Sequence, residues 1–135
     1  MLEERRMRII RRIFDAFVHE GSADPLMAAV SDDVECVLTI AKGTPLSGTF
    51  RGKAGLQRYF ETQADLAEIQ SIEILNFLAG GDQIAVAGRE TLHIKRTGEI
   101  CKDSDFVTLF TLREDTIIRI LTIEDTTSLA LAYRS

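Results

Sequence analysis

The sequence contains few of the residues that form metal sites and disulfides. Its two cysteines, Cys36 and Cys101, lie far apart and form no C-x-x-C motif, and His19 and His93 are not spaced to bind a metal with them. The segment 103–105 (Asp-Ser-Asp) lacks the third ligand, the glycine and the distal glutamate of a calcium loop. We therefore predict no metal and no cofactor, and we expect both cysteines to be reduced and buried on strands.

Long apolar runs and an excess of basic residues are also missing. No apolar run approaches the 18 residues of a membrane-spanning helix, and the first residues lack the tripartite order of a signal peptide. A net charge of −5 argues against a nucleic-acid footprint. We predict a cytoplasmic protein that binds neither membranes nor nucleic acids. Its 135 residues suffice for one domain, 1–135, with a sizeable core.

The glycine-rich stretch GTPLSGTFRGKAGLQRYF, residues 43–60, does not match a phosphate-binding loop. That loop needs the pattern G-x-x-x-x-G-K followed by Ser or Thr, because its lysine pairs with the phosphates and its hydroxyl holds magnesium. Gly43 and Gly48 have the required spacing, but Thr49 stands in the place of the lysine. The stretch must therefore have another role.

The periodicity of apolar residues predicts three helices with strands among them, followed by four more strands. Apolar residues at i, i+3 and i+4 indicate helices, and short segments that contain glycine separate four alternating strands near the C-terminus. We expect helices over 4–20, 24–30 and 54–67, and strands over 34–40, 49–50, 71–78, 83–95, 100–112 and 116–124. Turns this short make the last four strands an antiparallel meander. Helices on one face of such a sheet define a two-layer α+β fold.

Three segments resemble the nuclear transport factor 2-like superfamily, and within it the SnoaL-like and ketosteroid-isomerase-like proteins. These segments are IFDAFVHEGSADPLMAAVSDDVEC, GTFRGKAGLQRYF and DFVTLFTLREDTIIRILTIEDT. The resemblance covers nearly the whole chain and implies a cone-shaped, curved antiparallel sheet wrapped around three N-terminal helices, with a pocket at the open end. It also implies that the glycine-rich stretch is a strand-to-helix corner, where Gly52 allows a tight turn.

Glu90 is the candidate catalytic residue, because it is a carboxylate in phase with aliphatic residues. Side chains alternate between the two faces of a strand, and one face of 83–95 carries Ile84, Val86, Glu90, Leu92 and Ile94. Desolvation there would raise the pKa of the carboxyl group, which suits a general acid or base. Alternatively, Glu90 pairs with an arginine at the sheet rim, or a bulge shifts the phase of the strand.

Other residues could form the walls of the pocket, or could equally belong to the core. The candidate binding residues are Phe14, Phe17, Leu38, Tyr59, Phe106, Thr108 and Phe110. His93 falls on the polar phase of its strand, so a surface role is favoured over a catalytic one. Asp125 follows the last strand, where a capping role is favoured over catalysis.

Two functions of different class remain open, because the superfamily hosts isomerases, cyclases, hydrolases, dehydratases and proteins that only bind ligands. The chain is either a cofactor-independent acid–base enzyme acting on a small apolar carbonyl or cyclic compound, or a non-catalytic binding or dimerisation module. We predict a small-molecule ligand for the pocket.

The outer face of the sheet predicts a homodimer. Val107 and Leu109 lie opposite in phase to Phe106, and the last strand is apolar on both phases: Ile118 and Ile120 on one, Ile117, Leu121 and Ile123 on the other. Helices can cover only one face of the sheet, and a large exposed apolar patch usually marks an interface. The resemblance implies the same sheet-to-sheet dimer.

The resemblance also allows one activity to be excluded. Ketosteroid isomerisation needs a carboxylate base and an oxyanion hole built from a tyrosine and a protonated aspartic acid. Alignment with the family places Phe14 at the tyrosine position, Leu38 at the base position and Thr108 at the second acid. Phe14 has no donor and Leu38 cannot accept a proton, so we expect no ketosteroid isomerase activity.

Overall fold

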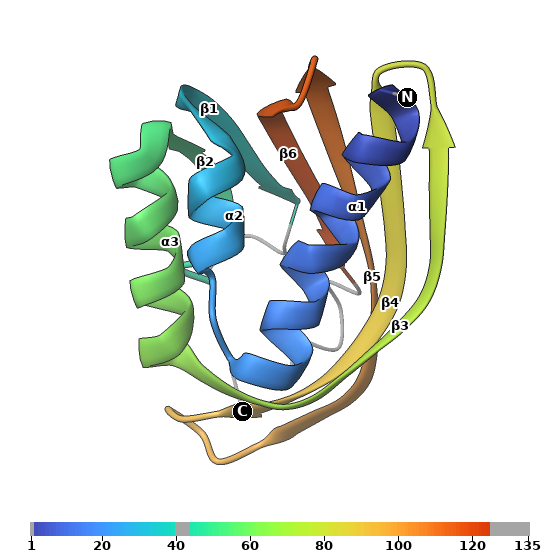
Figure 1. The fold of residues 1–135 in the computed structure, drawn as a ribbon. Helices are drawn as coiled ribbons and strands as arrows, with labels where there is room; N and C mark the ends of the chain where they lie inside the picture. Colours follow the sequence, from blue (N-terminus) through green and yellow to red (C-terminus); the bar gives the residue numbers. More distant parts are fainter. Residues whose placement is uncertain (1, 40–43, 125–135) are drawn as a thin grey trace.

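The computed structural model describes residues 2–39 and 44–124, and within them three α-helices lie on one face of a six-stranded sheet (Figure 1). The helical segments are α1 (Leu2–Asp15), a π-helical turn η1 (Ala16–Glu20), α2 (Asp24–Ala29) and α3 (Gly52–Leu66). The strands are β1 (Val30–Thr39), β2 (Gly48–Arg51), β3 (Ala67–Gly80), β4 (Gln83–Ile94), β5 (Ile100–Arg113) and β6 (Thr116–Glu124). The expected α+β order of elements is confirmed.

The sheet is mixed, so the prediction of an antiparallel sheet was wrong for one strand pair. Its strand order is β2-β1-β6-β5-β4-β3, and β1 runs parallel to β6. Short turns dictate that the consecutive strands β3, β4, β5 and β6 pair antiparallel. Because β1 and β6 are distant in the sequence, packing of the core sets their relative orientation. The sheet is open, with β2 and β3 at its edges, and it is neither closed nor strongly curled as the predicted cone would require.

Apolar residues of the helices form the core with the inner, helix-facing side of the sheet. Ile10, Ile13 and Phe14 of α1 are buried against it, as the helical spacing predicts. The predicted single helix is α-helical as far as Asp15 and π-helical from Ala16 to Glu20. It stops at Gly21, which adopts a left-handed φ of 60°. This turn shapes the surface beside the C-terminal end of α1.

Gly52 provides the tight turn expected between β2 and α3. Its φ is +72°, a conformation that other residues rarely adopt, and a Cβ atom there would lie 3.2 Å from the carbonyl oxygen of Asp32. The glycine-rich stretch therefore serves the corner between a strand and a helix.

A β-bulge in β6 corrects the predicted phase of that strand. Leu112 pairs with Ile117 and Thr111 pairs with Arg119, so Ile118 is an extra residue without a partner in this ladder. Ile117 and Ile120 are therefore buried on the same face, whereas a strict alternation places them on opposite faces. A period of two cannot reveal where such an insertion lies.

Candidate active site

The carboxyl group of Glu90 lies on the inner face of the sheet. Its neighbours of the same phase in β4 are buried: Ile84, Val86, Gly88, Leu92 and Ile94. Gly88 leaves room for an aromatic ring, because a Cβ atom there would lie 2.7 Å from Cζ of Phe106. A bulge in the β4–β5 ladder lies beyond Glu90, between it and Leu92, and both residues still face inward. Strand phase thus places this carboxyl group correctly.

Glu90 is hydrogen-bonded to a second carboxyl group, that of Glu124. The sheet register brings the two together: Glu90 pairs with Ser104 across β4 and β5, and Phe106, two residues further along, pairs with Glu124 of β6. The Ser104 hydroxyl donates a hydrogen bond of 3.2 Å to Oε2 of Glu124. Ser104 and Glu124 are both buried. Three neighbouring strands therefore contribute to one polar cluster inside an apolar layer.

The two carboxyl groups form a pair that holds a proton. Burial raises the pKa of Glu90 above its ordinary value of 4.5, and the hydrogen bond with Glu124 opposes this increase. A hydrogen bond between two carboxyl groups requires that one of them is protonated, because two carboxylates have no proton to share. The pair therefore contains an acid and a base at once, which is the arrangement that proton transfer needs.

Tyr59 of α3 lies close enough to this pair to respond to its charge. The pKa of its phenol is raised, first by burial and then by electrostatic interaction with Glu90, Cys36 and Glu124. The phenol therefore stays protonated and can act only as a hydrogen-bond donor or acceptor. Burial also raises the pKa of the Cys36 thiol, to about 11, which keeps it from acting as a nucleophile.

The candidate binding residues are placed together on the inner side, packed as a chain of aromatic rings. Phe14 contacts Phe110 at 5.9 Å and Phe17 at 5.7 Å between ring centroids, and Phe17 contacts Phe60 at 5.9 Å. The others are buried or half-buried in the same layer: Leu38, Tyr59, Phe106 and Thr108. Their membership of the core is evident, and their role as pocket walls stays a prediction.

The remaining candidates take other positions. His93 of β4 is half-buried and pairs in register with Glu68, on the phase opposite to Glu90. Asp125 lies outside the described residues. Cys36 and Cys101 are buried on β1 and β5, as expected. Within 2–39 and 44–124, no three His, Cys, Asp or Glu side chains are grouped so that they could hold a metal ion.

Two open grooves border α1, and neither is lined by Glu90. One, of about 490 Å³, lies between α1, η1 and β3, and the other, of about 500 Å³, lies between α1 and α2. Of the seven candidate binding residues, Phe14 alone contributes to either lining. The first groove also includes Ile72, whose cross-strand partner is Glu90, so it lies beside the carboxyl pair.

Sequence reasoning missed Glu124 and Ser104, although a signal for both was present. Ser104 shares the phase of Phe106, and Glu124 shares the phase of Ile120, so each is a polar residue on an otherwise apolar face. The same pattern, a polar residue on an apolar face, identified Glu90 as a candidate. What no pattern within one strand could supply was the register that brings the three side chains together.

The fold is shared with several solved structures. An NTF2-like protein from Burkholderia xenovorans LB400 is 28% identical, with 97% of each chain covered and a TM-score of 0.83. TerC, co-crystallised with polyporic acid, is 22% identical over 97% of this chain and 99% of its own, with a TM-score of 0.83. A candidate isomerase from Bacillus subtilis is 13% identical over 99% and 96% of the two chains, with a TM-score of 0.80.

No helix within the described residues has both the length and the apolar composition to cross a membrane.

Two further comparisons bear on identity. A search of curated proteins found no match. A family model described as a SnoaL-like domain matches residues 10–120, which is most of the sequence. The resemblance inferred from the three sequence segments is therefore confirmed: the chain belongs to the SnoaL-like domain family.

Proposed function

We propose that the protein is a cofactor-independent acid–base enzyme that moves a proton next to the carbonyl group of a small apolar or cyclic compound. The observation that carries this proposal is the hydrogen bond between the half-buried Glu90 and the buried Glu124, inside an apolar layer. Structural carboxylates on protein surfaces pair with basic residues, whereas the partner of Glu90 is another acid, Glu124. Glu124 also accepts a hydrogen bond from the Ser104 hydroxyl. Perturbed carboxyl groups of this kind are typical of functional sites.

The proposed reaction uses the pair as one unit. The unprotonated carboxylate accepts a proton from the carbon beside the carbonyl group, and the protonated carboxyl donates a hydrogen bond to the oxygen as it becomes an enolate. Return of the proton to a different carbon completes an isomerisation. In a cyclisation, the enolate carbon attacks a second carbonyl group, whose oxygen takes up the proton that the carboxylate removed. The substrate would enter among the aromatic rings over the inner face of the sheet, which form the proposed pocket.

The fold relatives are compatible with this chemistry. They include a candidate isomerase and a protein crystallised with polyporic acid. The alternative function, a non-catalytic ligand-binding module, uses the same interior without proton transfer. The specific observation that favours the enzyme is again the second carboxyl group, because binding of an apolar ligand needs no buried acid.

Solvent-exchange measurements test the proposal without knowledge of the substrate. A panel of small cyclic ketones is incubated with the protein in D₂O, and deuterium uptake beside the carbonyl group is measured by mass spectrometry. We expect uptake above the buffer rate for at least one compound, and a loss of about a hundredfold or more in Glu90→Gln, because an amide can neither hold nor release the proton that the carboxyl pair shares. Identical uptake in the wild-type protein and in Glu90→Gln across the panel would favour the binding module instead.

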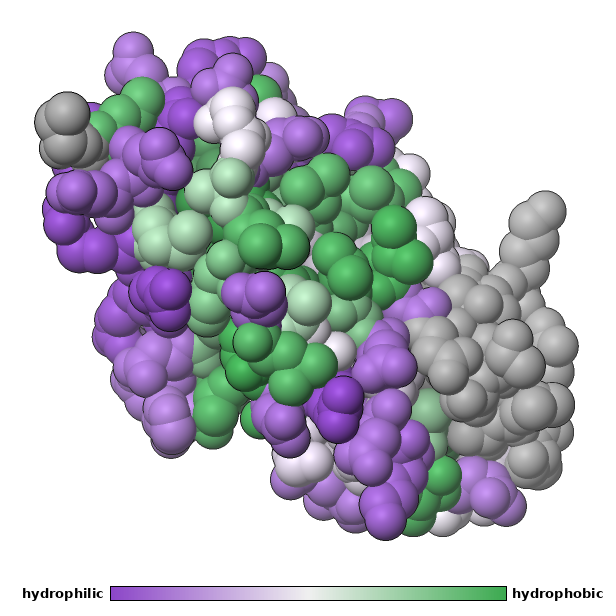
Figure 2. Space-filling model, turned by 90° about the vertical axis from the view of Figure 1, so that its right-hand side faces the viewer, coloured by the Kyte–Doolittle hydropathy of each residue, from purple (hydrophilic) through white to green (hydrophobic). Residues whose placement is uncertain are grey.

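We also propose that the protein forms a homodimer through the outer face of the sheet. Figure 2 shows an apolar area on the side formed by β3, β4 and β5, bordered by polar residues. Leu78 is 59% exposed, Val107 is 40% exposed and Ile123 of β6 is 51% exposed, and an apolar area of this kind usually marks an interface.

Analytical ultracentrifugation tests the dimer. Leu109→Glu should convert it to a monomer or to insoluble protein, because a charge would then be buried in the interface. A wild-type monomer at micromolar concentration would show that the outer face is not used in this way.

A further inference from the structure

The groove between α1, η1 and β3 has two chemically different sides. Its volume, about 490 Å³, is within the range of small-molecule sites. The lining residues are Arg11, Arg12, Phe14, Asp15, Val18, His19, Ile72, Ile74 and Phe77. Residues of β3 and Phe14 form an apolar floor, whereas charged and polar residues of α1 and η1 form the rim. A ligand that fits must therefore combine an apolar body with a polar group at one end.

The apolar floor offers flat surfaces. The rings of Phe14 and Phe77 meet edge to face, with centroids 6.3 Å apart and an interplanar angle of 80°. Ile74 lies in the same lining, and Val18, at the rim, is 38% exposed. Aromatic and aliphatic surfaces in this arrangement favour a planar ring system over a flexible chain, because stacking and edge contacts need a rigid partner.

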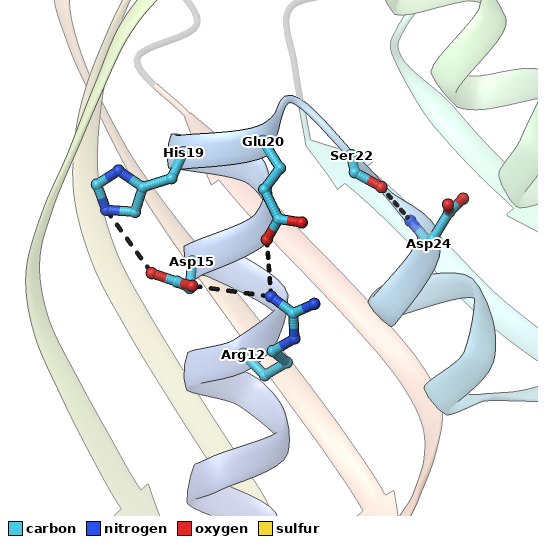
Figure 3. A network of polar contacts seen from close by, with 6 residues as sticks. All are labelled: Arg12, Asp15, His19, Glu20, Ser22 and Asp24. Carbon is cyan, nitrogen blue, oxygen red and sulfur yellow. Dashed lines mark hydrogen bonds and ion pairs between the residues drawn. The ribbon is translucent and has the colours of Figure 1, made fainter.

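Most of the charges on the rim are already paired, as Figure 3 shows. Arg12 lies 2.7 Å from Glu20 and 3.8 Å from Asp15, and His19 lies 3.7 Å from Asp15. The ion pair with Glu20 also raises the pKa of the Arg12 guanidinium group. Asp15 is therefore shared between Arg12 and His19, and Glu20 is paired with Arg12.

Arg11 differs from these neighbours, because it has no carboxylate partner among the described residues. Its guanidinium carbon lies 4.3 Å from the centroid of the Phe77 ring, in a cation–π contact over the apolar floor. This contact fixes the position of the charge and leaves the N–H donors of the guanidinium group available. The groove thus contains one positioned cation whose charge is not compensated.

We propose that this groove binds a small monoanion with a flat apolar ring system, and that Arg11 holds the anionic group. A carboxylate, a sulfonate or an acidic enol meets this description, because each presents oxygen acceptors to the guanidinium donors. A second negative charge would approach Asp15. The groove lies beside the carboxyl pair and is not lined by it, so the inference goes beyond the proposed function and does not rest on it.

A matched pair of dyes tests the role of the charge. The probes are 8-anilinonaphthalene-1-sulfonate, a planar aromatic monoanion, and the uncharged N-phenyl-1-naphthylamine, both followed by fluorescence titration. We expect Arg11→Met to weaken binding of the sulfonate by about tenfold or more, the effect of losing one charge-assisted hydrogen bond. Binding of the uncharged dye should change less than about twofold, since the apolar floor remains.

Two further variants separate the groove from other surfaces. Arg8→Met removes the same charge from the same helix but lies outside this groove, in the lining of the second one, and should leave sulfonate binding unchanged. Val18→Trp should fill the groove and weaken both dyes. Equal sulfonate binding in wild type and Arg11→Met, an equal loss in Arg8→Met, or undiminished binding in Val18→Trp would overturn the inference. Circular dichroism establishes that each variant is folded.

The outcome is separable from that of the proposed reaction. Glu90→Gln should bind both dyes as the wild type does, because Glu90 does not line the groove. Loss of deuterium exchange in Glu90→Gln together with unchanged dye binding in Arg11→Met would retain the enzyme proposal and reject the ligand class. The reverse pattern would retain the ligand class and reject the enzyme proposal.

Discussion

Glu35 and Glu90 are glutamates on opposite faces of the same sheet, and their surroundings give them opposite properties. Glu35 of β1 accepts hydrogen bonds from Arg119 at 3.0 Å and Arg51 at 2.8 Å, and these arginines, Arg119 first, lower the pKa of its carboxyl group. Glu90 of β4 lies on the inner face with Glu124 as its partner, and burial raises its pKa. The carboxyl group of Glu35 is therefore stabilised as a charged carboxylate, whereas that of Glu90 is stabilised in its protonated form.

This difference shows that strand phase decides what a carboxylate can do here. On the outer face, long arginine side chains from neighbouring strands reach a carboxylate and remain partly in water. On the inner face around Glu90, α3 supplies the Tyr59 phenol, and the core residues packed in this layer are apolar. The inward-facing Glu90 therefore has a raised pKa, and the outward-facing Glu35 has a lowered one.

The tight packing of the inner face near Glu90 predicts the largest effect. In Gly88→Ala, the new methyl group would lie 2.7 Å from the carbonyl oxygen of Glu73 and 2.7 Å from the Phe106 ring. We expect a loss of about 1–3 kcal/mol in the free energy of unfolding, as for other overpacked cores, measured by chemical denaturation. Gly80→Ala is the matched control, because no atom lies within 4 Å of its Cβ position. An equal loss in both variants would mean that packing is not the cause.

The pH dependence of stability should distinguish the two glutamates by sign. The folded state keeps a proton on Glu90 above pH 4.5, where the unfolded chain has lost it, so stability falls as pH rises from 4.5 towards the raised pKa. We expect the wild-type Tm to fall more steeply than that of Glu90→Gln as pH rises above 4.5, because only the wild type carries the carboxyl group that loses this proton. Parallel pH profiles of the two proteins would contradict the raised pKa.

Glu35 should behave in the opposite way, with a smaller effect. Its pKa is lowered, so its contribution to stability is present above pH 4.5 and is lost as pH falls through the lowered value. Arg119→Met should raise the pKa of Glu35 more than Arg51→Met does, because the hydrogen bond from Arg119 is the largest cause of the shift. Carboxyl ¹³C NMR titration measures both variants. A larger increase in Arg51→Met would reverse the assignment.

We expect the protein to have no ketosteroid isomerase activity. Phe14 and Leu38, at the family positions of the tyrosine and the base, are buried apolar side chains, and the loss of one oxyanion donor alone costs on the order of a hundredfold in rate. Glu90 lies on another strand and would approach a steroid from another direction. An absorbance assay with a 5-ene-3-ketosteroid measures the activity. Turnover that disappears in Glu90→Gln would show that a carboxylate on β4 can replace the missing base.

The sequence alone determined most of the local structure and the direction of Glu90. Helical and strand periods follow from backbone geometry, so apolar spacing located the elements, and the period of two placed the side chain of Glu90 on the inner face. The turn at Gly52 followed from the resemblance to the family, and its positive φ confirms it. These features depend on short stretches of chain.

Only the tertiary structure decided which residues meet. The parallel pairing of β1 with β6, the bulge at Ile118 and the contact between Glu90 and Glu124 each depend on segments far apart in the sequence. The position of Arg11 over Phe77 likewise depends on how α1 packs beside β3. Register and packing minimise the free energy of the whole chain, and no local pattern encodes that minimum, so the partners of each side chain emerge only when the layers assemble.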